Sequence, residues 1–453
     1  MRSADEAGGD PGAGAASRPV SVWRIAAYRR WLALDSSSAF GEAIKTFVFP
    51  MLALIATGDP AAAGVVGATG TVILAISDLI GGNLADRLTK LRLLTWIAVT
   101  GPVLGIAWWV CMMLGAGAHA WVLLLFTALY SIRYGLTGSA STGLLVELLD
   151  EGHVGPALAA NQGRDATISL TGAPLGGLIL GFATWLAAPV LLLLDLIAVV
   201  AALRLRGHRS DVDAATGDGE AQAARDDDPD SDSGESAAEP AGFFTESIAG
   251  FRWVATRADV LGGLAAAVLL SMGLGLAVTA QLYALQQQGY PVSLIGVVAS
   301  AMGAGMLLGS TFAGRLMTRF RGGILVLVCG LLMLACLALL AQFDEVWQVM
   351  ILIGVFALGI PVFNAVMMGY VLLAVPPRLL GRVNSAASVI NLGAAALPSL
   401  IVGFLLVPWD RTSLALIATG LLGLAVIVIA ANTALRGIPR TDDWKSYAAE
   451  FAK

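Results

Sequence analysis

The chain has 453 residues, of which 57% are hydrophobic and only 13% are charged. Soluble domains carry about 25% charged residues, so this composition excludes a soluble globular protein and predicts a membrane protein with several spans. The formal charge of −5 arises in residues 210–241, which hold eleven acids and one base, whereas the rest of the chain carries +5. The acidity therefore does not predict a basic partner.

The hydrophobic stretches predict an all-α integral membrane protein with twelve transmembrane helices, because each is long enough to cross a bilayer, which takes about 20 residues. The expected spans are residues 31–57, 61–85, 92–115, 120–148, 164–183, 186–205, 260–286, 292–318, 323–342, 345–374, 380–407 and 411–436. A polar tail without a cleavable signal peptide, residues 1–28, precedes them, and residues 437–453 form a C-terminal tail.

Basic residues follow every second predicted span. They are Arg87, Lys90, Arg92, Arg204, Arg206, Arg209, Arg315, Arg319, Arg321, Arg378, Arg382, Arg436 and Arg440. The opposite loops are short, and Arg411 is their only base. By the positive-inside rule, this asymmetry predicts that both termini lie in the cytoplasm and that the protein resides in the cell membrane.

The first predicted span carries Asp35, Glu42 and Lys45 in an otherwise apolar helix. An ionisable group at mid-membrane costs at least about 2.5–3.5 kcal/mol on insertion scales, so such groups face protein or a water-filled cavity. Asp35 and Glu42 are seven residues apart and share a helix face. We expect Glu42 to carry a coupling proton and Asp35 to act nearer the cytoplasmic end. A purely structural i, i+3 pair of Glu42 with Lys45 is the alternative.

Arg133, in the fourth span, is the expected partner of these acids. Arginine stays charged, a carboxylate beside it ionises easily, and a carboxylate in an apolar pocket keeps its proton. A carboxylate that alternates between these surroundings can carry a proton across, whereas a static network of Glu42, Lys45 and Arg133 is the alternative. Asp78, in the second span, is expected on the proton path or in helix packing. Asp195, in the sixth span, has no evident partner and is interpreted as structural.

A polar segment, residues 206–241, divides the spans into an N-terminal half, residues 29–205, and a C-terminal half, residues 258–436. Its Asp, Gly, Ser and Ala content predicts a flexible cytoplasmic linker. Residues 242–257 follow with apolar side chains at helical spacing and arginines on the polar side. They predict an amphipathic helix on the inner membrane surface.

The spans of the C-terminal half contain no acid well inside the membrane, so we expect a cavity lined by amide, hydroxyl, methionine and aliphatic groups. Such a lining suits an amphipathic substrate held by few polar anchors. Transporters built from repeated halves bind substrate near the midplane between them. The expected cavity residues are Tyr130, Tyr134, Gln281, Tyr283, Asn364, Met367 and Asn391.

The loop after the second span reads Gly82-x-Leu84-Ala-Asp86-Arg87-x-x-Lys90-x-Arg92. It resembles the helix 2–3 signature of the major facilitator superfamily, with departures at Thr89 and Leu91. The resemblance implies two six-helix pseudo-repeats and a cytoplasmic latch that holds the halves together when a transporter faces outward. Asp86 would face the N-terminal end of the helix beginning near Leu380, where free N–H groups favour an anion. Arg87 would pair with Glu147 or Asp150.

The gate residues that this resemblance implies are Gly82, Asp86, Arg87, Lys90, Arg92, Glu147 and Asp150. The alternative is that the basic residues of the loop only set the topology.

A second motif, Gly172-Ala-Pro174-Leu-Gly176-Gly177, resembles the antiporter motif that the superfamily largely restricts to exporters, with Ala173 where a proline usually stands. Glycines permit close helix contact and proline bends a span, so tight packing is the alternative. Asn161-Gln-Gly-Arg164-Asp165 and the Pro-Pro-Arg segment at 376–378 are similar to the drug:proton antiporter group, which includes macrolide and enterobactin exporters.

These features predict a monomeric transporter that exports an amphipathic small molecule, such as a drug, a siderophore or another secondary metabolite, in exchange for protons. Its expected partners are this substrate, protons and the bilayer, without nucleic acid. No nucleophile–base set, phosphate loop or metal-ligand spacing indicates an enzyme, a cofactor or a metal site. One alternative is a transporter of lipid-like molecules or a dedicated metabolite without strict proton coupling. Another is a non-transporting sensor or scaffold that acts through the acidic linker.

Overall fold

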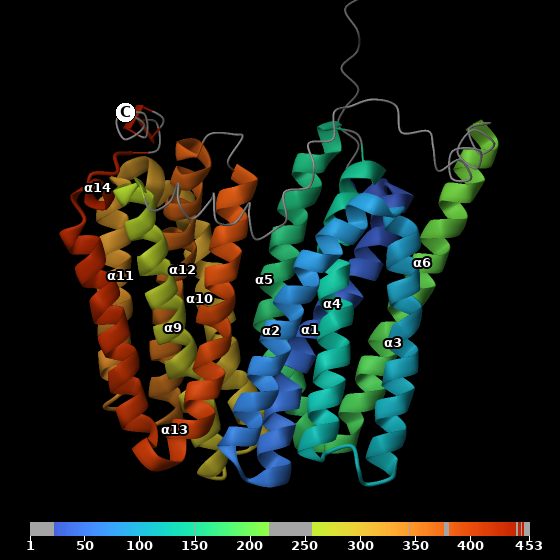
Figure 1. Ribbon diagram of the computed structural model, residues 1–453, viewed down its shortest axis with the longest axis horizontal. Coiled ribbons are helices and arrows are strands. Elements are labelled where there is room, and N and C mark those ends of the chain that lie inside the picture. Colours follow the sequence, from blue (N-terminus) through green and yellow to red (C-terminus); the bar gives the residue numbers. More distant parts are fainter. Residues whose placement is uncertain are drawn as a thin grey trace, which may run out of the picture.

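The computed structural model describes residues 22–149, 151–216, 256–343, 345–375, 380–440, 443–444 and 446–447. This part of the chain forms long helices joined by short turns (Figure 1). The helices are α1 (Ala26–Thr57), α2 (Pro60–Arg87), α3 (Lys90–Met113), α4 (Ala120–Leu148), α5 (Glu151–Phe182), α6 (Ala187–Thr216), α9 (Ala258–Gln287), α10 (Val292–Arg319), α11 (Gly322–Leu340), α12 (Val346–Ala374), α13 (Leu380–Ala431) and α14 (Thr433–Arg436). Two short 3₁₀ turns, Val22–Arg24 and Thr184–Leu186, precede α1 and α6.

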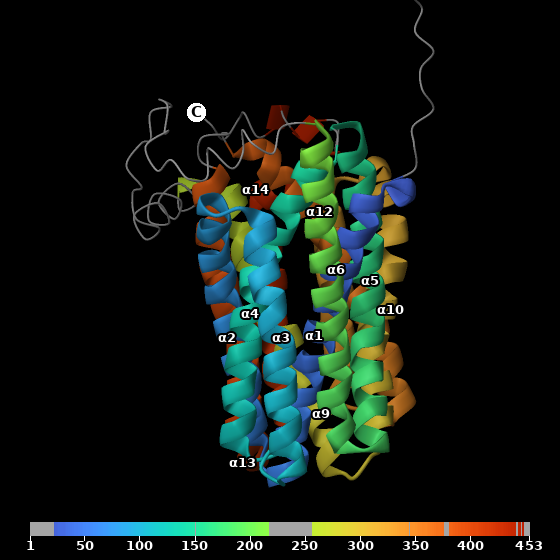
Figure 2. The same cartoon turned by 90° about the vertical axis from the view of Figure 1, so that its right-hand side faces the viewer.

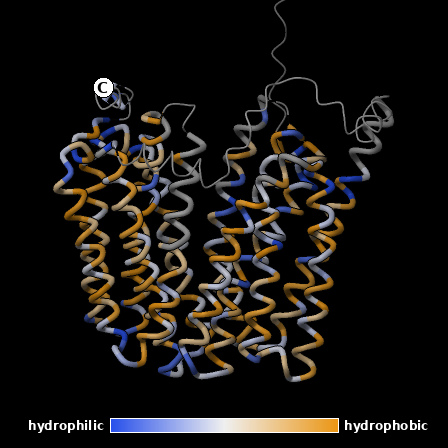
Figure 3. Tube along the Cα trace, viewed as in Figure 1, coloured by the Kyte–Doolittle hydropathy of each residue, from blue (hydrophilic) through white to orange (hydrophobic). Residues whose placement is uncertain are grey.

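The described helices are built for a lipid environment. Eleven of them are long and apolar enough to cross a membrane. Figure 3 shows hydrophobic residues along the middle of the helices and hydrophilic residues mainly near the two ends. Large apolar side chains such as Trp96, Val103, Leu193 and Ile427 are more than half exposed. Apolar side chains that are exposed around the middle of the helices match the hydrocarbon core of a bilayer.

Helix α13 accounts for two predicted spans. Asp410 interrupts it with left-handed backbone angles (φ 58°, ψ 173°), two residues after Pro408. The Asp410 carboxylate accepts a hydrogen bond from the Ser413 N–H at 2.8 Å, which caps the arm that follows. The chain reverses direction there (Figure 1). The eleven candidate helices therefore correspond to the twelve predicted spans.

Turn chemistry at the first reversal agrees with the sequence. Gly58 ends α1 with φ 66°, a conformation that suits glycine, and its N–H donates to the Leu54 carbonyl at 2.8 Å. The Asp59 side chain accepts from the Ala61 N–H at 2.8 Å, and Pro60 begins α2. These residues place α1 and α2 side by side in opposite directions.

The helices form two halves, α1–α6 and α9–α13 (Figure 1). We call the end with the α2–α3 and α10–α11 turns the basic end, because Lys90, Arg92, Arg319 and Arg321 lie there. The other end is called the opposite end. Figure 2 shows the helices of the N-terminal half running along one axis between these ends. The ribbons of the two halves approach at the opposite end and separate toward the basic end (Figure 1).

The structure differs from the prediction at the start of the linker and adds contacts for the C-terminal tail. Helix α6 continues to Thr216, so the linker does not begin at residue 206. Most of the predicted linker, the amphipathic segment before Thr256 and most of the N-terminal tail lie outside the described residues. The predicted C-terminal tail packs against the bundle: the Gly322 N–H donates to the Pro439 carbonyl at 3.0 Å, and Tyr447 Oη donates to the Ala434 carbonyl at 2.7 Å.

Candidate functional site

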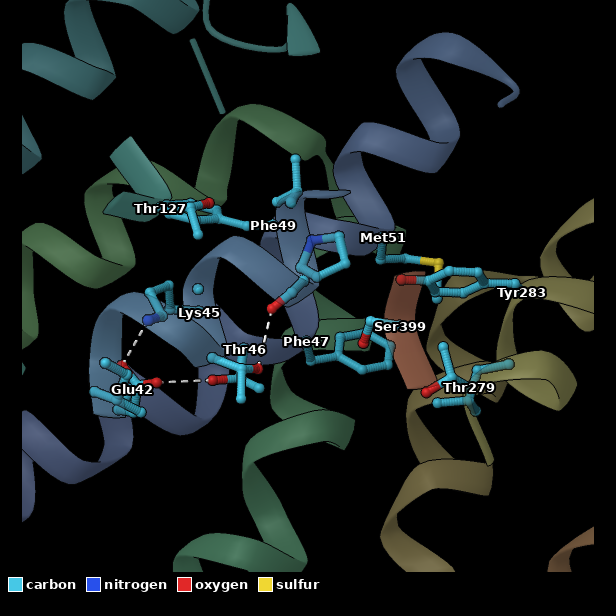
Figure 4. A pocket seen from close by; sticks show the side chains of 17 residues that line it. Glu42, Lys45, Thr46, Phe47, Phe49, Met51, Thr127, Thr279, Tyr283 and Ser399 are labelled. Atoms are coloured by element: carbon cyan, nitrogen blue, oxygen red, sulfur yellow. Dashed lines mark hydrogen bonds and ion pairs between the residues drawn. The ribbon is translucent and has the colours of Figure 1, made fainter. Parts of the chain in front are cut away.

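A cavity of about 220 Å³ lies between the two halves and is lined from α1, α2, α4, α9 and α13. Its polar lining residues are Glu42, Lys45, Thr46, Thr71, Thr127, Thr279, Tyr283 and Ser399. Phe47, Phe49 and Met51 are among its apolar walls (Figure 4). Pro50 of α1 also lines the cavity and lacks the N–H that would bond the Thr46 carbonyl, which weakens the helix at this level.

Glu42 and Lys45 form an ion pair at the cavity wall. The Lys45 Nζ atom lies 2.8 Å from Glu42 Oε2, and Thr46 Oγ1 donates to Glu42 Oε1 at 3.0 Å (Figure 4). The two side chains differ in exposure: 3% for Lys45 and 23% for Glu42. Lys45 also donates to Ser131 Oγ on α4 at 2.8 Å. The Lys45 ammonium group is therefore held inside the N-terminal half, whereas the Glu42 carboxylate is accessible from the cavity.

Tyr134 of α4 separates this pair from Arg133. The Lys45 Nζ atom lies 5.4 Å from the centroid of the Tyr134 ring, and the Arg133 guanidinium carbon lies 5.1 Å from it. Both distances fall within the usual range of cation–π contacts. Gly41 makes room for this ring, since a Cβ atom there would stand 2.1 Å from Tyr134 Oη.

The predicted pairing of Arg133 with the acids of the first span is wrong. Arg133 Nη1 lies 2.7 Å from Asp195 Oδ1 of α6, and its Nε donates to the Ile97 carbonyl of α3 at 3.2 Å. Tyr130 Oη donates to Asp195 Oδ2 at 3.4 Å. The side chains of Arg133 and Asp195 are 4% and 3% exposed. Asp195 therefore does have a partner, and the pair lies inside the N-terminal half, away from the lining of the cavity.

Asp35 forms a third acid–base contact, which the sequence analysis missed. Its Oδ2 atom lies 2.5 Å from Arg164 Nη1 of α5, and its Oδ1 atom accepts a hydrogen bond from Ser141 of α4. Arg164 also pairs with Asp165 at 2.7 Å and lies over the Trp31 ring. Asp35 thus connects α1 with α4 and α5, nearer the basic end than Glu42. Arg164 was singled out only as part of a motif, because spacing along the chain does not show which helices face each other.

The predicted gate is described in part. Lys90 Nζ lies 2.5 Å from Glu147 Oε1, so Lys90 is a partner of this acid, for which Arg87 was predicted. Arg92 is exposed and Gly82 is half-buried. The side chains of Asp86, Arg87 and Asp150 lie outside the described residues, so the latch stays a prediction.

Asp78 lies against α4. A Cβ atom at Gly138 would stand 3.1 Å from the Asp78 carboxylate.

The glycines of the antiporter-like motif face two different neighbours. A Cβ atom at Gly172 would stand 2.6 Å from Ala43 Cβ, and one at Gly176 would stand 3.0 Å from Phe47, so both face α1. Gly177 instead faces the other half: a Cβ atom there would stand 2.7 Å from the Val292 carbonyl oxygen.

The same added Cβ atom at Gly177 would stand 3.0 Å from Gly296 Cα of α10, and Pro174 packs on Gly296 as well. Gly64 of α2 meets Gly403 of α13 in the same way, with a Cβ atom 2.8 Å from Gly403 Cα. These contacts join the two halves at the opposite end, where α2 and α10 begin and α5 ends.

The predicted cavity residues separate in the structure. Tyr283 lines the central cavity. Asn364 lines a different one, of about 290 Å³, together with Ser271. Gln281 is buried instead, and its Oε1 accepts from Arg411 Nη1 at 3.2 Å. Met367 is buried, and its Sδ atom would lie 2.8 Å from a Cβ atom at Gly263.

Tyr130 and Tyr134 pack beside the central cavity without lining it, and the side chain of Asn391 lies outside the described residues. The polar lining residues that were missed are all Thr and Ser, which are too common in membrane helices to give a signal.

Comparisons with known proteins agree with this architecture. Residues 263–451 match the family model of the Major Facilitator Superfamily. A comparison with curated protein sequences gives no match. A crystal structure of the nucleoside transporter NupG aligns with a TM-score of 0.63 at 13% identity, covering 89% of this chain and 100% of that chain. The chain has the fold of these transporters.

Two further solved structures align over nearly their whole length. A bacterial homologue of the iron transporter ferroportin, in an inward-facing state, gives a TM-score of 0.63 at 15% identity and covers 89% of this chain and 98% of that chain. A bacterial homologue of the human lysosomal transporter Spinster, inward-facing and unoccupied, gives 0.56 at 14% identity and covers 94% and 98%. At such identities the likeness shows the fold alone.

Proposed function

We propose that the protein is a secondary active transporter that exports a small amphipathic molecule from the cytoplasm in exchange for protons. The observation that carries the proposal is Glu42, a carboxylate on the wall of a cavity shared by both halves and paired with the buried Lys45. This carboxylate pairs with Lys45, accepts a hydrogen bond from Thr46 and is reachable from the cavity. It has what a site needs in order to bind and release a proton.

The chemistry of the cavity supports an organic substrate with an apolar body. Phe47, Phe49 and Met51 supply apolar area, while Thr279, Ser399 and other hydroxyl groups supply single hydrogen bonds. Binding sites for small molecules have this composition, with few polar groups that fix the orientation of the ligand. Drugs, siderophores and other secondary metabolites are the classes that we propose.

Alternating access is supported by the asymmetry between the two ends. The glycine contacts of Gly64 with Gly403 and of Gly177 with Gly296 hold the halves together at the opposite end. If the basic end is cytoplasmic, as its arginines predict, the described conformation faces the cytoplasm. Rocking of the halves about the cavity would break these glycine contacts and close the basic end, where the latch around Asp86 would form.

Proton exchange would then proceed at Glu42. In the outward-facing state, the carboxylate takes a proton from the outer solution and its attraction to Lys45 weakens. After the halves reorient, the proton leaves to the cytoplasm, and Glu42 pairs with Lys45 again as in the described conformation. Inward movement of the proton drives the substrate outward. The Asp35–Arg164 pair is a second acid–base contact on α1 and lies nearer the basic end.

The test begins with a screen for compounds that accumulate less in cells that make the protein. A compound found in this way is then followed in proteoliposomes with an imposed proton gradient. Glu42→Gln keeps the shape of the side chain but cannot release a proton, so gradient-driven transport should fall to the level of empty vesicles while counterflow of the compound persists. Glu345→Gln, which changes an exposed acid at the start of α12, should transport normally. Normal gradient-driven transport by the Glu42→Gln protein would remove Glu42 from the mechanism.

A further inference from the structure

Another cavity, of about 440 Å³, lies on the outside of the N-terminal half between α1 and α6. The upper part of helix α6 forms the right-hand edge of the molecule in Figure 1. Arg29 and Arg30 of α1 and Arg204 of α6 line one part of this groove. None of its lining residues also lines the central cavity. The groove therefore requires an explanation separate from that of the transport site.

The positive charge in the groove is not balanced by the described residues. Within the described part of the chain, no ion pair involves Arg29, Arg30 or Arg204. The Arg30 Nη1 atom is buried and has no hydrogen-bond partner there. A buried guanidinium nitrogen without a partner is costly, and an anion with several oxygen atoms would satisfy it. The first requirement on the ligand is therefore a negative, phosphate-like group.

The remainder of the groove is apolar and exposed. Leu196, Ile197 and Val200 of α6 line it and are 43–48% exposed on the face that meets lipid. Val200 lies one helical turn from Arg204, and the other two lie a further turn toward the middle of the membrane. The ligand thus needs an anionic group at the basic end joined to an apolar chain that runs along α6.

We propose that this groove binds an anionic phospholipid of the leaflet at the basic end. Its phosphate contacts Arg29, Arg30 and Arg204, and one acyl chain lies along Leu196, Ile197 and Val200. Basic pockets between membrane helices are suited to anionic lipid headgroups, and the cytoplasmic leaflet is where anionic lipids concentrate. A free phosphate would use only the arginines, so the apolar wall selects the lipid.

The test uses the full-length protein, delipidated in a neutral detergent, and native mass spectrometry to measure lipid binding. Phosphatidylglycerol should bind, and phosphatidylcholine with the same acyl chains should bind at least about 30-fold more weakly. Each arginine near a headgroup contributes about fivefold, so Arg30→Gln with Arg204→Gln should lower the affinity for phosphatidylglycerol about 30-fold. The matched control, Arg319→Gln with Arg321→Gln, removes two charges at the same end of the other half and should bind as the unaltered protein does.

A second variant keeps the arginines and blocks the apolar part. Ala33 is exposed and lines the groove, so Ala33→Trp fills the groove without entering the core. This variant should also lose phosphatidylglycerol binding, and soluble glycerol phosphate should not bind at the concentration that saturates with the lipid.

Four results would overturn the proposal: equal binding of the two lipids, full binding by both groove variants, binding of glycerol phosphate as tight as that of the lipid, or lipid binding only after deletion of residues 217–238. The last result would assign the arginines to the acidic segment of the chain.

Discussion

At the scale of single residues, three acid–base pairs lie among the membrane-spanning helices of the N-terminal half. Glu42–Lys45 faces the central cavity, Asp35–Arg164 joins α1 to α5, and Arg133–Asp195 joins α4 to α6. The last pair is the most deeply buried, and Gly101 of α3 is required beside it, since a Cβ atom there would stand 2.7 Å from both partners. We therefore expect the Arg133–Asp195 pair to hold three helices in one arrangement.

The stability of that arrangement can be measured through Asp195. Asp195→Asn leaves the guanidinium group of Arg133 buried without a counter-charge, which should lower the free energy of unfolding by about 3–5 kcal/mol. Replacing both partners, with Arg133→Met and Asp195→Leu, should recover most of this loss. Chemical unfolding in detergent micelles gives both values, with Glu345→Gln as a control expected to change stability by less than about 0.5 kcal/mol. An Asp195→Asn protein as stable as the unaltered one would show that the pair is not structural.

The sequence predicts residue pairs within one helix, but it does not predict pairs between helices. Glu42 and Lys45 are three residues apart, so helix geometry alone predicts that they meet. Arg133 and Asp195, like Asp35 and Arg164, lie on different helices, and their meeting depends on how each helix is rotated about its axis. Hydrophobic length does not fix that rotation, and this is why Arg133 was matched with the wrong acids.

Between whole helices, contacts of glycine with backbone decide where the two halves meet. Gly177 on Gly296 and Gly64 on Gly403 bring α5 against α10 and α2 against α13, so the opposite end has two related contacts. Close backbone approach gives dense packing without long side chains, and such a contact can open and close with little rearrangement. The antiporter-like motif thus supplies one of the glycine contacts that join the halves at this end.

A single methyl group added at Gly177 should shift the equilibrium between the states in which the opposite end is closed and open. Gly177→Ala places a Cβ atom 2.7 Å from a backbone oxygen, and overpacking of this kind costs about 1–3 kcal/mol, which favours the state with the opposite end open by about fivefold or more. Gly163→Ala is the matched control on the same helix, because nothing lies within 4 Å of a Cβ atom there.

The readout is the reactivity of Thr279→Cys toward a charged thiol reagent added from outside, measured in each background. It should rise at least about fivefold in Gly177→Ala and remain unchanged in Gly163→Ala. Equal reactivity in both variants would contradict the role of this contact.

Helix boundaries followed from the sequence where the bilayer sets them. Apolar length predicted the spans, and the first turn falls where the predicted spans 31–57 and 61–85 leave a gap. The sequence failed where a helix continues beyond the apolar stretch: α6 runs on through polar residues to Thr216, because a helix needs no apolar side chains outside the membrane. The break at Asp410 was placed between two expected spans, but its left-handed backbone was not foreseen, since Asp adopts this conformation only occasionally.

For the molecule as a whole, one geometric feature underlies the proposed transport. The face of α1 that carries Glu42 borders a cavity that both halves share and that water enters from the basic end. The cavity lining and the glycine contacts at the opposite end support this statement. Proton coupling, export and the nature of the substrate all rest on it, whereas the proposed lipid groove does not.

Thiol labelling tests this statement most directly. In a protein without Cys111, Cys329 and Cys336, Thr46→Cys places a thiol at an exposed position of the cavity wall, beside Glu42. Val103→Cys is the control, since Val103 is 64% exposed on the outer face of α3. A charged, membrane-impermeant reagent should label Thr46→Cys in inside-out vesicles and leave Val103→Cys unlabelled. Failure to label Thr46→Cys from that side would contradict the account.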